Sequence, residues 1–482
     1  MKKQQKNSRR VLIALIPLVV LIGLLAFDIA IFGADSILGA SQVALLAASG
    51  VCAALSMWLY KTPWKEFEKS IIGHVGDVAP AIIILFLIGA ISGTWTMGGV
   101  VPAFIYYGIK IISPKVFLLT ACVLCSVVSV LTGSSWTTIA TVGVALIGIG
   151  RAEGFSDAMT AGAIISGAYF GDKISPLSDT TVLASSINRV DLFEHIRYML
   201  YTTVPSIIIT LTVFTVLGFT HGGVPDSRMD TFSEMLASHF NITPWLLVVP
   251  AFTLWLIYRK KPAIVVLTLS ILAAAVAAVV FQGPVVRSIG ENITSGSPFR
   301  VYFSGIVKII YDTVSIDTGN ADVNALVTSR GMLGMLNTVF LILCAMCFGA
   351  CMRSSGMIAD LARTLTPLTR TRGGLVGSTV FTGTALNGIV SDQYLSVILT
   401  SNIFRESFER EGYEGRLLSR SVEDSATVTS PLFPWSSCGM TQATILSVPT
   451  LVYAPFCFFN IISPLMSFTI ALIGWKIVKK HK

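Results

Sequence analysis

The sequence predicts an all-α polytopic membrane protein with about ten transmembrane helices and two re-entrant hairpins. Hydrophobic residues fill 53% of its 482 positions and charged residues only 12%, about half of the roughly 25% that soluble domains carry. Many apolar runs approach or exceed the roughly 20 residues that a helix needs to cross a bilayer. Two polar segments lie between apolar arms that are too short to cross comfortably. They predict the hairpins, because irregular backbone at membrane depth must line a cavity.

The distribution of charge predicts the orientation of these helices. The net charge of +8 comes from lysines and arginines at the chain ends and between apolar runs, as the positive-inside rule requires of cytoplasmic segments. No nucleic-acid partner is therefore predicted. The basic N-terminus and the long first run, 11–32, indicate a spanning helix rather than a cleaved signal peptide. We expect a multi-pass protein of the cell inner (plasma) membrane, surrounded by the lipid bilayer, with both termini cytoplasmic.

Residues 1–220 are predicted to form the first of two inverted repeats. Scaffold helices come first, followed by a hairpin at 116–150 with a polar tip at 132–138 and then by a broken helix at 158–188. The scaffold helices are expected at 11–32, 40–60 and 78–97, with an aromatic run along the outer interface at 100–112. The half ends with an interfacial stretch at 191–201 and a crossing run at 205–220.

An external connection at 221–242 leads to the second predicted repeat, residues 243–482. Its scaffold helices are expected at 245–258, 263–281 and 331–350, around an external segment at 282–330 that contains an amphipathic helix at 299–311. A hairpin at 373–404, with its tip placed at 382–388, precedes a broken helix at 417–446 and a last span at 454–475.

Three features recur in the same order in the two halves. Thr-Gly-Ser at 132–134 precedes Asp172 and Ser-Pro-Leu at 175–177, and Thr-Gly-Thr at 382–384 precedes Asp424 and Ser-Pro-Leu at 430–432. Loop charges place the first hairpin on the outer side and the second on the cytoplasmic side. Inverted repeats of this kind predict a binding site near the midplane, where the halves meet.

The stretch at 167–181 carries the clearest functional information. Charge at membrane depth is costly, so its two acids, Asp172 and Asp179, are candidates for a functional site. Pro176 cannot continue a helix and disfavours helical geometry at Ser175. We therefore expect the helix to break in mid-membrane and to expose carbonyl oxygens beside the carboxylates, as at the ion sites of many secondary transporters.

The ion or substrate is expected to be bound by acids, hydroxyls and an amide from both hairpins and both broken helices. The candidates are Ser134, Ser135, Thr137, Asp172, Ser175, Ser178, Asp179, Thr180, Thr384, Asn387, Asp392, Asp424, Thr427 and Ser430. Among them, Asp172, Asp179 and Asp424 are the expected sodium ligands.

Each of these assignments has a structural alternative. Helix capping and close helix packing explain the hydroxyl and amide side chains equally well. Asp172 could instead pair with Lys173 to hold the loop, and Lys173 is a better counter-ion for the acids than a substrate ligand. Glu423 fits a cytoplasmic-side surface acid as well as it fits a ligand. Eight cysteines lie mostly in apolar runs without the histidines of a metal site, so we expect small buried residues and no cofactor.

The stretch at 167–181 closely resembles the NhaC-type sodium/proton antiporter family of the ion transporter superfamily. Glu423-Asp424 and Ser-Pro-Leu-Phe-Pro-Trp at 430–435 are similar to that family's second half, and the likeness covers nearly the whole chain. The resemblance implies an elevator-type transporter with a scaffold domain and a mobile transport domain of two hairpins and two broken helices. It also implies sodium/proton antiport or exchange of malate-like or lactate-like anions or amino acids, and leaves the choice open.

The leading functional prediction is a secondary active transporter, not an enzyme, in which sodium ions and protons compete for midplane carboxylates. The alternative is a sodium- or proton-coupled exchanger of small carboxylates or amino acids. An intramembrane protease and a channel are remote alternatives. Tyr169 occupies the first-glycine position of the Gly-x-Gly-Asp pattern of aspartyl proteases, and no intramembrane histidine accompanies Ser134 or Ser135 as a base. A homodimer is compatible with the sequence.

Overall fold

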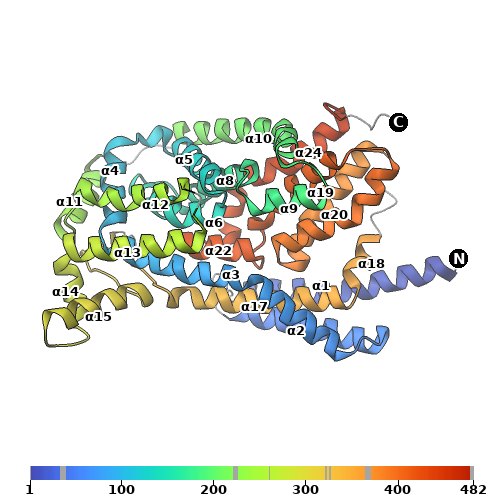
Figure 1. Ribbon diagram of the computed structural model, residues 1–482, viewed down its shortest axis with the longest axis horizontal. Helices are drawn as coiled ribbons and strands as arrows, with labels where there is room; N and C mark the ends of the chain where they lie inside the picture. The colour runs from blue at the N-terminus through green and yellow to red at the C-terminus, as the bar shows by residue number, and fades with distance from the viewer. Residues whose placement is uncertain are drawn as a thin grey trace.

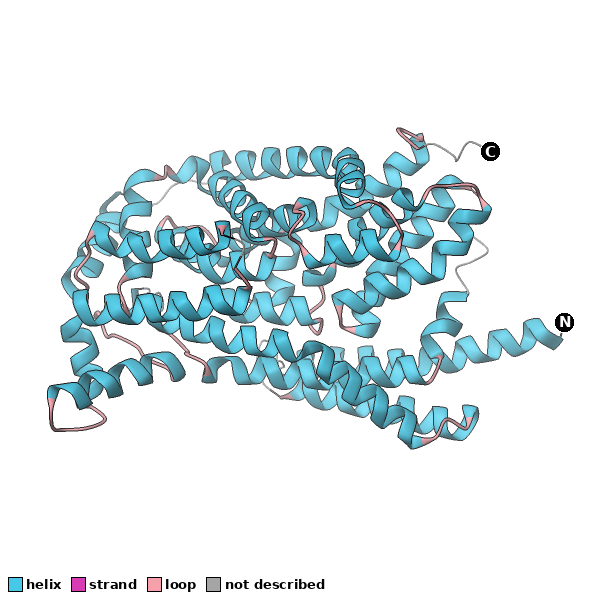
Figure 2. Cartoon of the chain, in the orientation of Figure 1, coloured by secondary structure: helices cyan, strands magenta, loops and turns pink. Residues whose placement is uncertain are grey.

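The computed structural model describes residues 2–32, 39–220, 226–259, 261–320, 323–324, 327–363 and 371–477. These residues form α-helices with short 3₁₀ and π segments, and their only β pairing is the isolated bridge between Val314 and Ser329 (Figure 2). In this described part, seven helices are long and apolar enough to cross a membrane, or up to ten if each of three bent helix pairs is one span. The prediction of an all-α polytopic membrane protein is confirmed.

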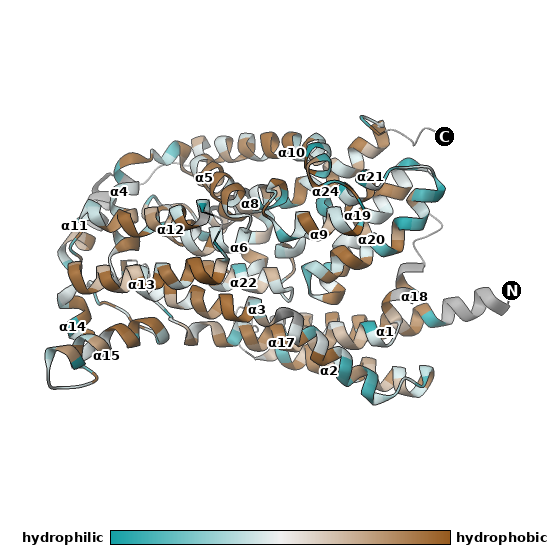
Figure 3. Ribbon diagram, in the orientation of Figure 1, coloured by the Kyte–Doolittle hydropathy of each residue, from teal (hydrophilic) through white to brown (hydrophobic). Residues whose placement is uncertain are grey.

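The surface of the helices is apolar where a soluble protein would be polar. Ile22, Val216, Val280 and Leu472 lie on four different helices, and more than half of each side chain is exposed. Figure 3 shows hydrophobic residues along most of the helices and a concentration of hydrophilic residues at the end of the molecule where the described termini lie. Exposed apolar surface of this extent requires a covering, and a bilayer supplies it.

The helices form two groups that appear as a lower and an upper layer in Figure 1. The lower group contains helices that pack on one another: α1 (Lys2–Phe32), α2 (Ala40–Leu55), α3 (Trp64–Met97), α13 (Ala263–Phe281) and α17 (Leu336–Ser354). The upper group contains α5 (Phe117–Thr132), α8 (Asp157–Ile174), α10 (Leu192–Thr220), α19 (Arg372–Val390), α20 (Gln393–Arg410) and α24 (Phe458–Ile473). The two groups meet where α17 packs on α19 and on α22 (Ser437–Leu446).

The first hairpin turns at Gly133, within the predicted tip. Helix α5 ends there because Gly133 adopts a left-handed conformation with φ of 65°, which glycine tolerates without a side-chain clash. A Cβ on Gly133 would also lie 2.5 Å from the carbonyl carbon of Leu177. Ser134 then caps the next helical segment by accepting a hydrogen bond from the Thr137 N–H. That segment runs through α6 (Ser135–Thr138), the π segment η4 (Ile139–Gly143) and α7 (Val144–Ala152).

The predicted break at Pro176 is confirmed. Helix α8 ends at Ile174, and α9 (Asp179–Ile187) begins after four non-helical residues. Gly167 and Gly171 of α8 face α5 so closely that a Cβ at either position would clash with the α5 backbone. The small residues therefore bring the broken helix against the first arm of the hairpin.

The second hairpin turns at Ser391, so the predicted tip at 382–388 is wrong. Residues 382–388 belong to α19, and the chain turns at Ser391, which is left-handed with φ of 61°, before Asp392 caps α20. Gly383 provides close contact with Ser425 rather than a turn. The second broken helix consists of α21 (Gly415–Val422), the π segment η8 (Glu423–Thr427), the short η9 (Ser430–Leu432) and α22.

Further boundaries differ from the prediction. Helix α3 begins at Trp64 and not at residue 78. The interfacial stretch at 191–201 and the crossing run at 205–220 form the single helix α10, which continues through Pro205, as transmembrane helices often do. The amphipathic helix expected at 299–311 is confirmed as α15 (Pro298–Tyr311). All eight cysteines are free, and seven of them are buried, as expected.

The remaining helices connect these units. The aromatic run becomes α4 (Val100–Ile111), which bends 65° away from α3. The other connecting elements are α11 (Asp226–His239), η5 (Pro244–Leu247), α12 (Val248–Tyr258), α14 (Gly283–Glu291), α18 (Met357–Arg363) and α23 (Thr450–Tyr453).

Candidate functional site

A cavity of about 830 Å³ lies between the two groups of helices. Its walls come from α3, α13 and α17 on one side and from both hairpin turns and the start of α9 on the other. Both hairpin turns and the first helix break therefore converge on one space. The second broken helix reaches the cavity lining at the start of α22, through Ser437 and Cys438.

Asp172 is a buried acid of this cavity, with 6% of its surface exposed, against 5% for Asp392. One carboxylate oxygen, Oδ2, accepts hydrogen bonds from the Ser135 N–H at 3.2 Å and the Ser135 hydroxyl at 2.7 Å. The other, Oδ1, accepts one from the Ser178 hydroxyl at 2.6 Å. A carboxylate has about four lone-pair positions. About one position is therefore left for a ligand that enters from the cavity.

The surroundings of Asp172 follow directly from the local sequence. Ser135 is brought to it by the turn at Gly133, and Ser178 by the break that Pro176 forces on α8. Thr180 hydrogen-bonds to Ser178 at 3.0 Å and supplies a further hydroxyl to the cavity. The result is a charged oxygen site surrounded by hydroxyl groups, which can donate a hydrogen bond or use a lone pair to bind a cation.

Eight of the fourteen predicted site residues line the cavity: Ser134, Ser135, Thr137, Asp172, Ser178, Asp179, Thr180 and Asp392. Asp179 lies at its exposed edge as the first residue of α9. Asp392 is buried and caps α20 by accepting a hydrogen bond from the Leu395 N–H at 2.8 Å.

Asp424 does not line the cavity, although it was an expected sodium ligand. Its Oδ1 pairs with the Lys173 ammonium group and accepts a hydrogen bond from the Thr202 hydroxyl at 3.0 Å. Its Oδ2 lies 3.8 Å from Nε of Arg420. All three ionic side chains are fully buried. The structure therefore does not bring Asp172, Asp179 and Asp424 together as one set of ligands.

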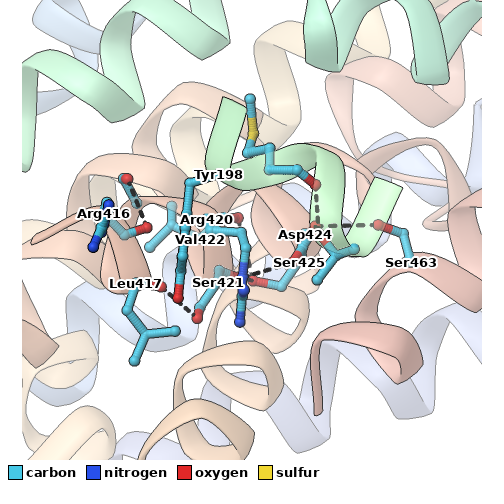
Figure 4. Close-up of polar contacts among 12 residues, drawn as sticks. Tyr198, Arg416, Leu417, Arg420, Ser421, Val422, Asp424, Ser425 and Ser463 are labelled. Atoms are coloured by element: carbon cyan, nitrogen blue, oxygen red, sulfur yellow. Dashed lines mark hydrogen bonds and ion pairs between the residues drawn. The ribbon is translucent and has the colours of Figure 1, made fainter. Parts of the chain in front are cut away.

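Figure 4 shows Asp424 with its neighbours Arg420 and Ser463, and Tyr198 beside Arg420. The Ser463 hydroxyl of α24 lies beside Asp424 and accepts a hydrogen bond from Lys173 at 3.0 Å. The Arg420 guanidinium group stacks over the Tyr198 ring at 4.7 Å. Lys173 is thus a counter-ion, as expected, but its partner is Asp424 and not the neighbouring Asp172.

The other five predicted residues that lie outside the cavity lining are buried or half-buried elsewhere. Ser175 donates to the Val130 carbonyl at 2.7 Å and fixes the break against α5. Asn387 donates to the Ala426 carbonyl at 2.7 Å, which joins α19 to η8. Ser430 donates to Gln393 Oε1 at 3.1 Å. Thr384 is half-buried on α19, and Thr427 is fully buried on η8.

Sequence reasoning missed several residues of the cavity. Gln393, Tyr394 and Cys438 line it, and the Cys438 thiol lies 2.7 Å from Gln393 Oε1. His74 and Lys261 come from the lower group of helices. No local pattern identifies these five residues, because each is brought to the cavity only by the packing of distant helices. Within the described residues, no three histidines, cysteines or acids are placed to hold a metal ion together.

The charge of the lining favours a cationic ligand. Three carboxylates, from Asp172, Asp179 and Asp392, face a single lysine, Lys261, and one histidine. Carboxylates with few compensating cations lower the free energy of a bound cation and raise that of a bound anion. The cavity is also large enough for a small organic molecule, since ligand pockets typically measure about 300–1,000 Å³.

Comparison with known proteins agrees with this chemistry. A sequence model described as the Na+/H+ antiporter family matches residues 6–186 and 167–475. The chain is 37% identical to the malate-2H(+)/Na(+)-lactate antiporter of Bacillus subtilis over 402 residues, which cover 83% of this chain and 82% of that protein. It is 34% identical to the Na(+)/H(+) antiporter NhaC of Alkalihalophilus pseudofirmus over 87% of each chain. It is 31% identical to the arginine/ornithine antiporter ArcD of Halobacterium salinarum over 97% of this chain and 93% of that protein.

Proposed function

The chain belongs to the Na+/H+ antiporter family, and we propose that it exchanges Na+ for protons by binding the cation at Asp172. The observation that carries this proposal is the position of that carboxylate. It is buried, it faces a cavity, and it is held by Ser135 and Ser178 rather than neutralised by a basic side chain. A buried carboxylate in this state is expected to bind either a proton or a cation.

Competition at one carboxylate is sufficient to couple the two ions. When Na+ approaches, the hydroxyl oxygens of Ser135, Ser178 and Thr180 can turn their lone pairs toward it while Asp172 supplies the negative charge. When a proton binds instead, the carboxyl group becomes neutral and loses most of its attraction for the cation. Asp179, at the exposed edge of the cavity, adds negative charge that attracts Na+ from solution.

A second candidate function follows from the size of the cavity. About 830 Å³ exceeds what a single Na+ requires, and two relatives are named as exchangers of malate and lactate and of arginine and ornithine. An ammonium group would meet the three acids of the lining. A substrate carboxylate would meet one lysine, Lys261, and one histidine, His74, because Lys173 is held by Asp424. The lining therefore favours an amino-containing solute over a dicarboxylate as the organic substrate.

We further propose that the upper group of helices moves as a transport domain against the lower group. Support comes from the position of the cavity between the two groups and from the hairpins, which enter from opposite ends of the molecule in Figure 1. The repeat relation has structural support as well. Each hairpin turns at a left-handed residue followed by a helix-capping side chain, at Gly133 and Ser134 and at Ser391 and Asp392. Each broken helix stops near a Ser-Pro-Leu sequence.

The orientation in the membrane is part of the proposal. The described ends of the chain lie at the same end of the molecule in Figure 1, together with the C-terminal half of α20, which carries Arg405 and Arg410. The positive-inside rule places this end in the cytoplasm. We therefore place the protein in the inner (plasma) membrane with both termini cytoplasmic.

Proteoliposomes test the proposed exchange. An imposed Na+ gradient should drive protons in the opposite direction with no organic solute present, and a pH-sensitive dye inside the vesicles measures this movement. Proton movement that requires an added amino acid or carboxylate would replace the leading proposal with the second one. Sodium flux that needs no opposing proton or solute gradient would indicate a channel and contradict both.

A further inference from the structure

A second acid lies outside the cavity, and its carboxylate forms no ion pair and no hydrogen bond of ordinary geometry with the described residues. Glu423, on the π segment η8, is fully buried, and neither of its carboxylate oxygens forms a hydrogen bond. Thr427 lies on the same segment, and its buried hydroxyl is near enough to act on the Glu423 carboxylate, although the two side chains do not form a hydrogen bond of ordinary geometry. Glu423 does not line the cavity at Asp172. Single π turns inside helices often occur at functional positions.

Burial opposes a negative charge on Glu423, and so do two nearby acids, Asp172 and Asp424, whereas Lys173 favours it. Lys173 is already paired with Asp424. The helices packed on η8 are α9, α19, α20, α21 and α24. Their remaining charged groups are Asp179 on α9, Arg372 on α19, Arg405, Glu406, Glu409 and Arg410 on α20, and Arg416 and Arg420 on α21, whereas α24 has none.

All five of these arginines are already engaged. Arg405 donates to the Ile187 carbonyl, Arg410 pairs with Glu411, and Arg416 pairs with Glu194 and Glu414. The Arg372 guanidinium group donates to the carbonyls of Ala471 and Leu472, and Arg420 lies over Tyr198 and beside Asp424. Ionised Glu423 would thus be a third carboxylate, after Asp172 and Asp424, in a place without water-exposed surface, and the two buried cations nearby, Lys173 and Arg420, both face Asp424. Leaving a buried carboxylate unpaired costs several kcal/mol or more.

A proton is the ligand that removes this cost. Sodium needs several oxygen ligands, and Glu423 and Thr427 together supply three side-chain oxygen atoms, which lie outside the lining of the Asp172 cavity. A proton needs only the carboxylate, which it converts to a neutral carboxylic acid that can then donate a hydrogen bond to a neighbouring oxygen.

We propose that Glu423 is a proton-binding site in its own right, separate from the cation cavity. This inference rests on the proposed Na+/H+ exchange, and it adds one transported proton to the proton that Na+ displaces from Asp172. Loading of Glu423 would then accompany one direction of transport and its release the other. The transporter would exchange more than one proton for each Na+, and membrane potential would drive it.

Two measurements test this site, and the first does not depend on transport. Infrared difference spectra of the purified wild type should contain a carbonyl band of a protonated carboxylic acid that disappears in Glu423→Gln. Thr427→Val should shift the frequency of that band, since it changes the group beside the carboxyl. A band that persists in Glu423→Gln, or that Thr427→Val leaves unshifted, would overturn the assignment.

The second measurement is the coupling ratio in proteoliposomes, obtained from the membrane potential at which opposing Na+ and pH gradients balance. Glu423→Gln mimics the protonated form, so the ratio of protons to Na+ should fall by one. Exchange of radioactive Na+ for unlabelled Na+, which needs no net proton movement, should stay near the wild-type rate and shows that the variant is folded. The matched control is Glu409→Gln, an exposed acid on α20, which should keep both the infrared band and the ratio.

The outcomes separate the two proposals. An unchanged ratio in a Glu423→Gln variant that still exchanges Na+ would overturn the role of Glu423 while leaving Na+/H+ antiport intact. Loss of Na+/Na+ exchange in Glu423→Gln would likewise overturn it, because the residue would then belong to the cation site or to the packing. A wild type that moves no protons against Na+ would contradict the proposed function itself.

Discussion

Replacing Asp424 by Asn is expected to destabilise the protein more than replacing Lys173 by Met. The reason is an imbalance within the buried cluster. Asp424 is a single carboxylate that faces two cations, Lys173 and Arg420, and all three side chains are fully buried. Asp424→Asn keeps the shape of the side chain but leaves two buried cations without an anion. Lys173→Met leaves Asp424 and Arg420 as a neutral pair whose charged atoms are already 3.8 Å apart.

The expected magnitudes follow from these contacts. Breaking a buried ion pair by removing one partner typically costs about 3–5 kcal/mol, and Asp424→Asn should reach at least this range because it strands two cations. Lys173→Met removes the ammonium group and its hydrogen bond to Ser463. Hydrogen bonds to charged groups contribute about 1.5–3 kcal/mol, and Arg420 still balances the charge of Asp424. We expect a cost of about 1–3 kcal/mol for this variant.

Equilibrium unfolding of the purified protein in detergent measures the two costs. The control is Glu291→Gln, which removes the anion of an exposed pair with Arg287 and should cost less than about 1 kcal/mol. A Lys173→Met variant as unstable as Asp424→Asn would refute the reasoning, because Arg420 would then contribute nothing to the charge balance. An Asp424→Asn variant with wild-type stability would show that the buried pair has no structural role.

Three further changes have defined outcomes. Gly133→Val should reduce both stability and transport, because the new side chain would need a left-handed backbone and would strike Leu177; heat stability and Na+ uptake measure this. Ser135→Ala should raise the KM for Na+ about tenfold while the protein stays folded, since Asp172 loses a 2.7 Å hydroxyl contact; a KM unchanged from wild type would exclude Ser135 as a ligand. Burial raises the pKa of Glu153, in the connection after α7, from 4.5 to about 8. Between these pH values the folded state then binds more protons than the unfolded state, so the free energy of unfolding should fall as pH rises from about 4.5 to 8. Unfolding experiments at a series of pH values measure this, and the free energy of unfolding of a Glu153→Gln variant should depend less on pH.

The first half of the candidate site could be predicted because its determinants are local. Pro176 removes a backbone hydrogen-bond donor directly after α8, and a glycine can turn α5 into the hairpin without help from distant residues. These two positions place Ser135 and Ser178 beside Asp172. Charge at membrane depth then identifies Asp172 and Asp179 as the acids to consider.

The second hairpin could not be located in the same way, because glycine has more than one use in a membrane helix. Gly383 allows α19 to approach Ser425, and the turn is made eight residues later by Ser391, a residue that seldom adopts a left-handed conformation. The sequence pattern at 382–384 matches the first turn in composition but not in structure. Small residues for packing and small residues for turning look alike in a sequence.

The role of Asp424 could not be predicted either, because its partner is 251 residues away along the chain. An acid and a lysine in separate halves carry no sequence sign that they pair. The same holds for Glu423, which directly precedes Asp424 in η8 and has no such partner. Only the side-chain contacts of Lys173, Thr202 and Ser463 with Asp424 distinguish the paired acid from the unpaired one.

Sodium binding to the purified protein tests the role of Asp172 most directly. Radioactive Na+ should bind to the wild type and should be displaced as pH falls, because protons compete for the same carboxylate. Asp172→Asn removes the charge at constant size and should weaken binding at least about tenfold, or 1.4 kcal/mol, in a folded protein. The control is Asp157→Asn on the same helix, a partly exposed acid paired with Arg151, which should bind Na+ as the wild type does. Wild-type Na+ affinity in Asp172→Asn would contradict the assignment of the cation site.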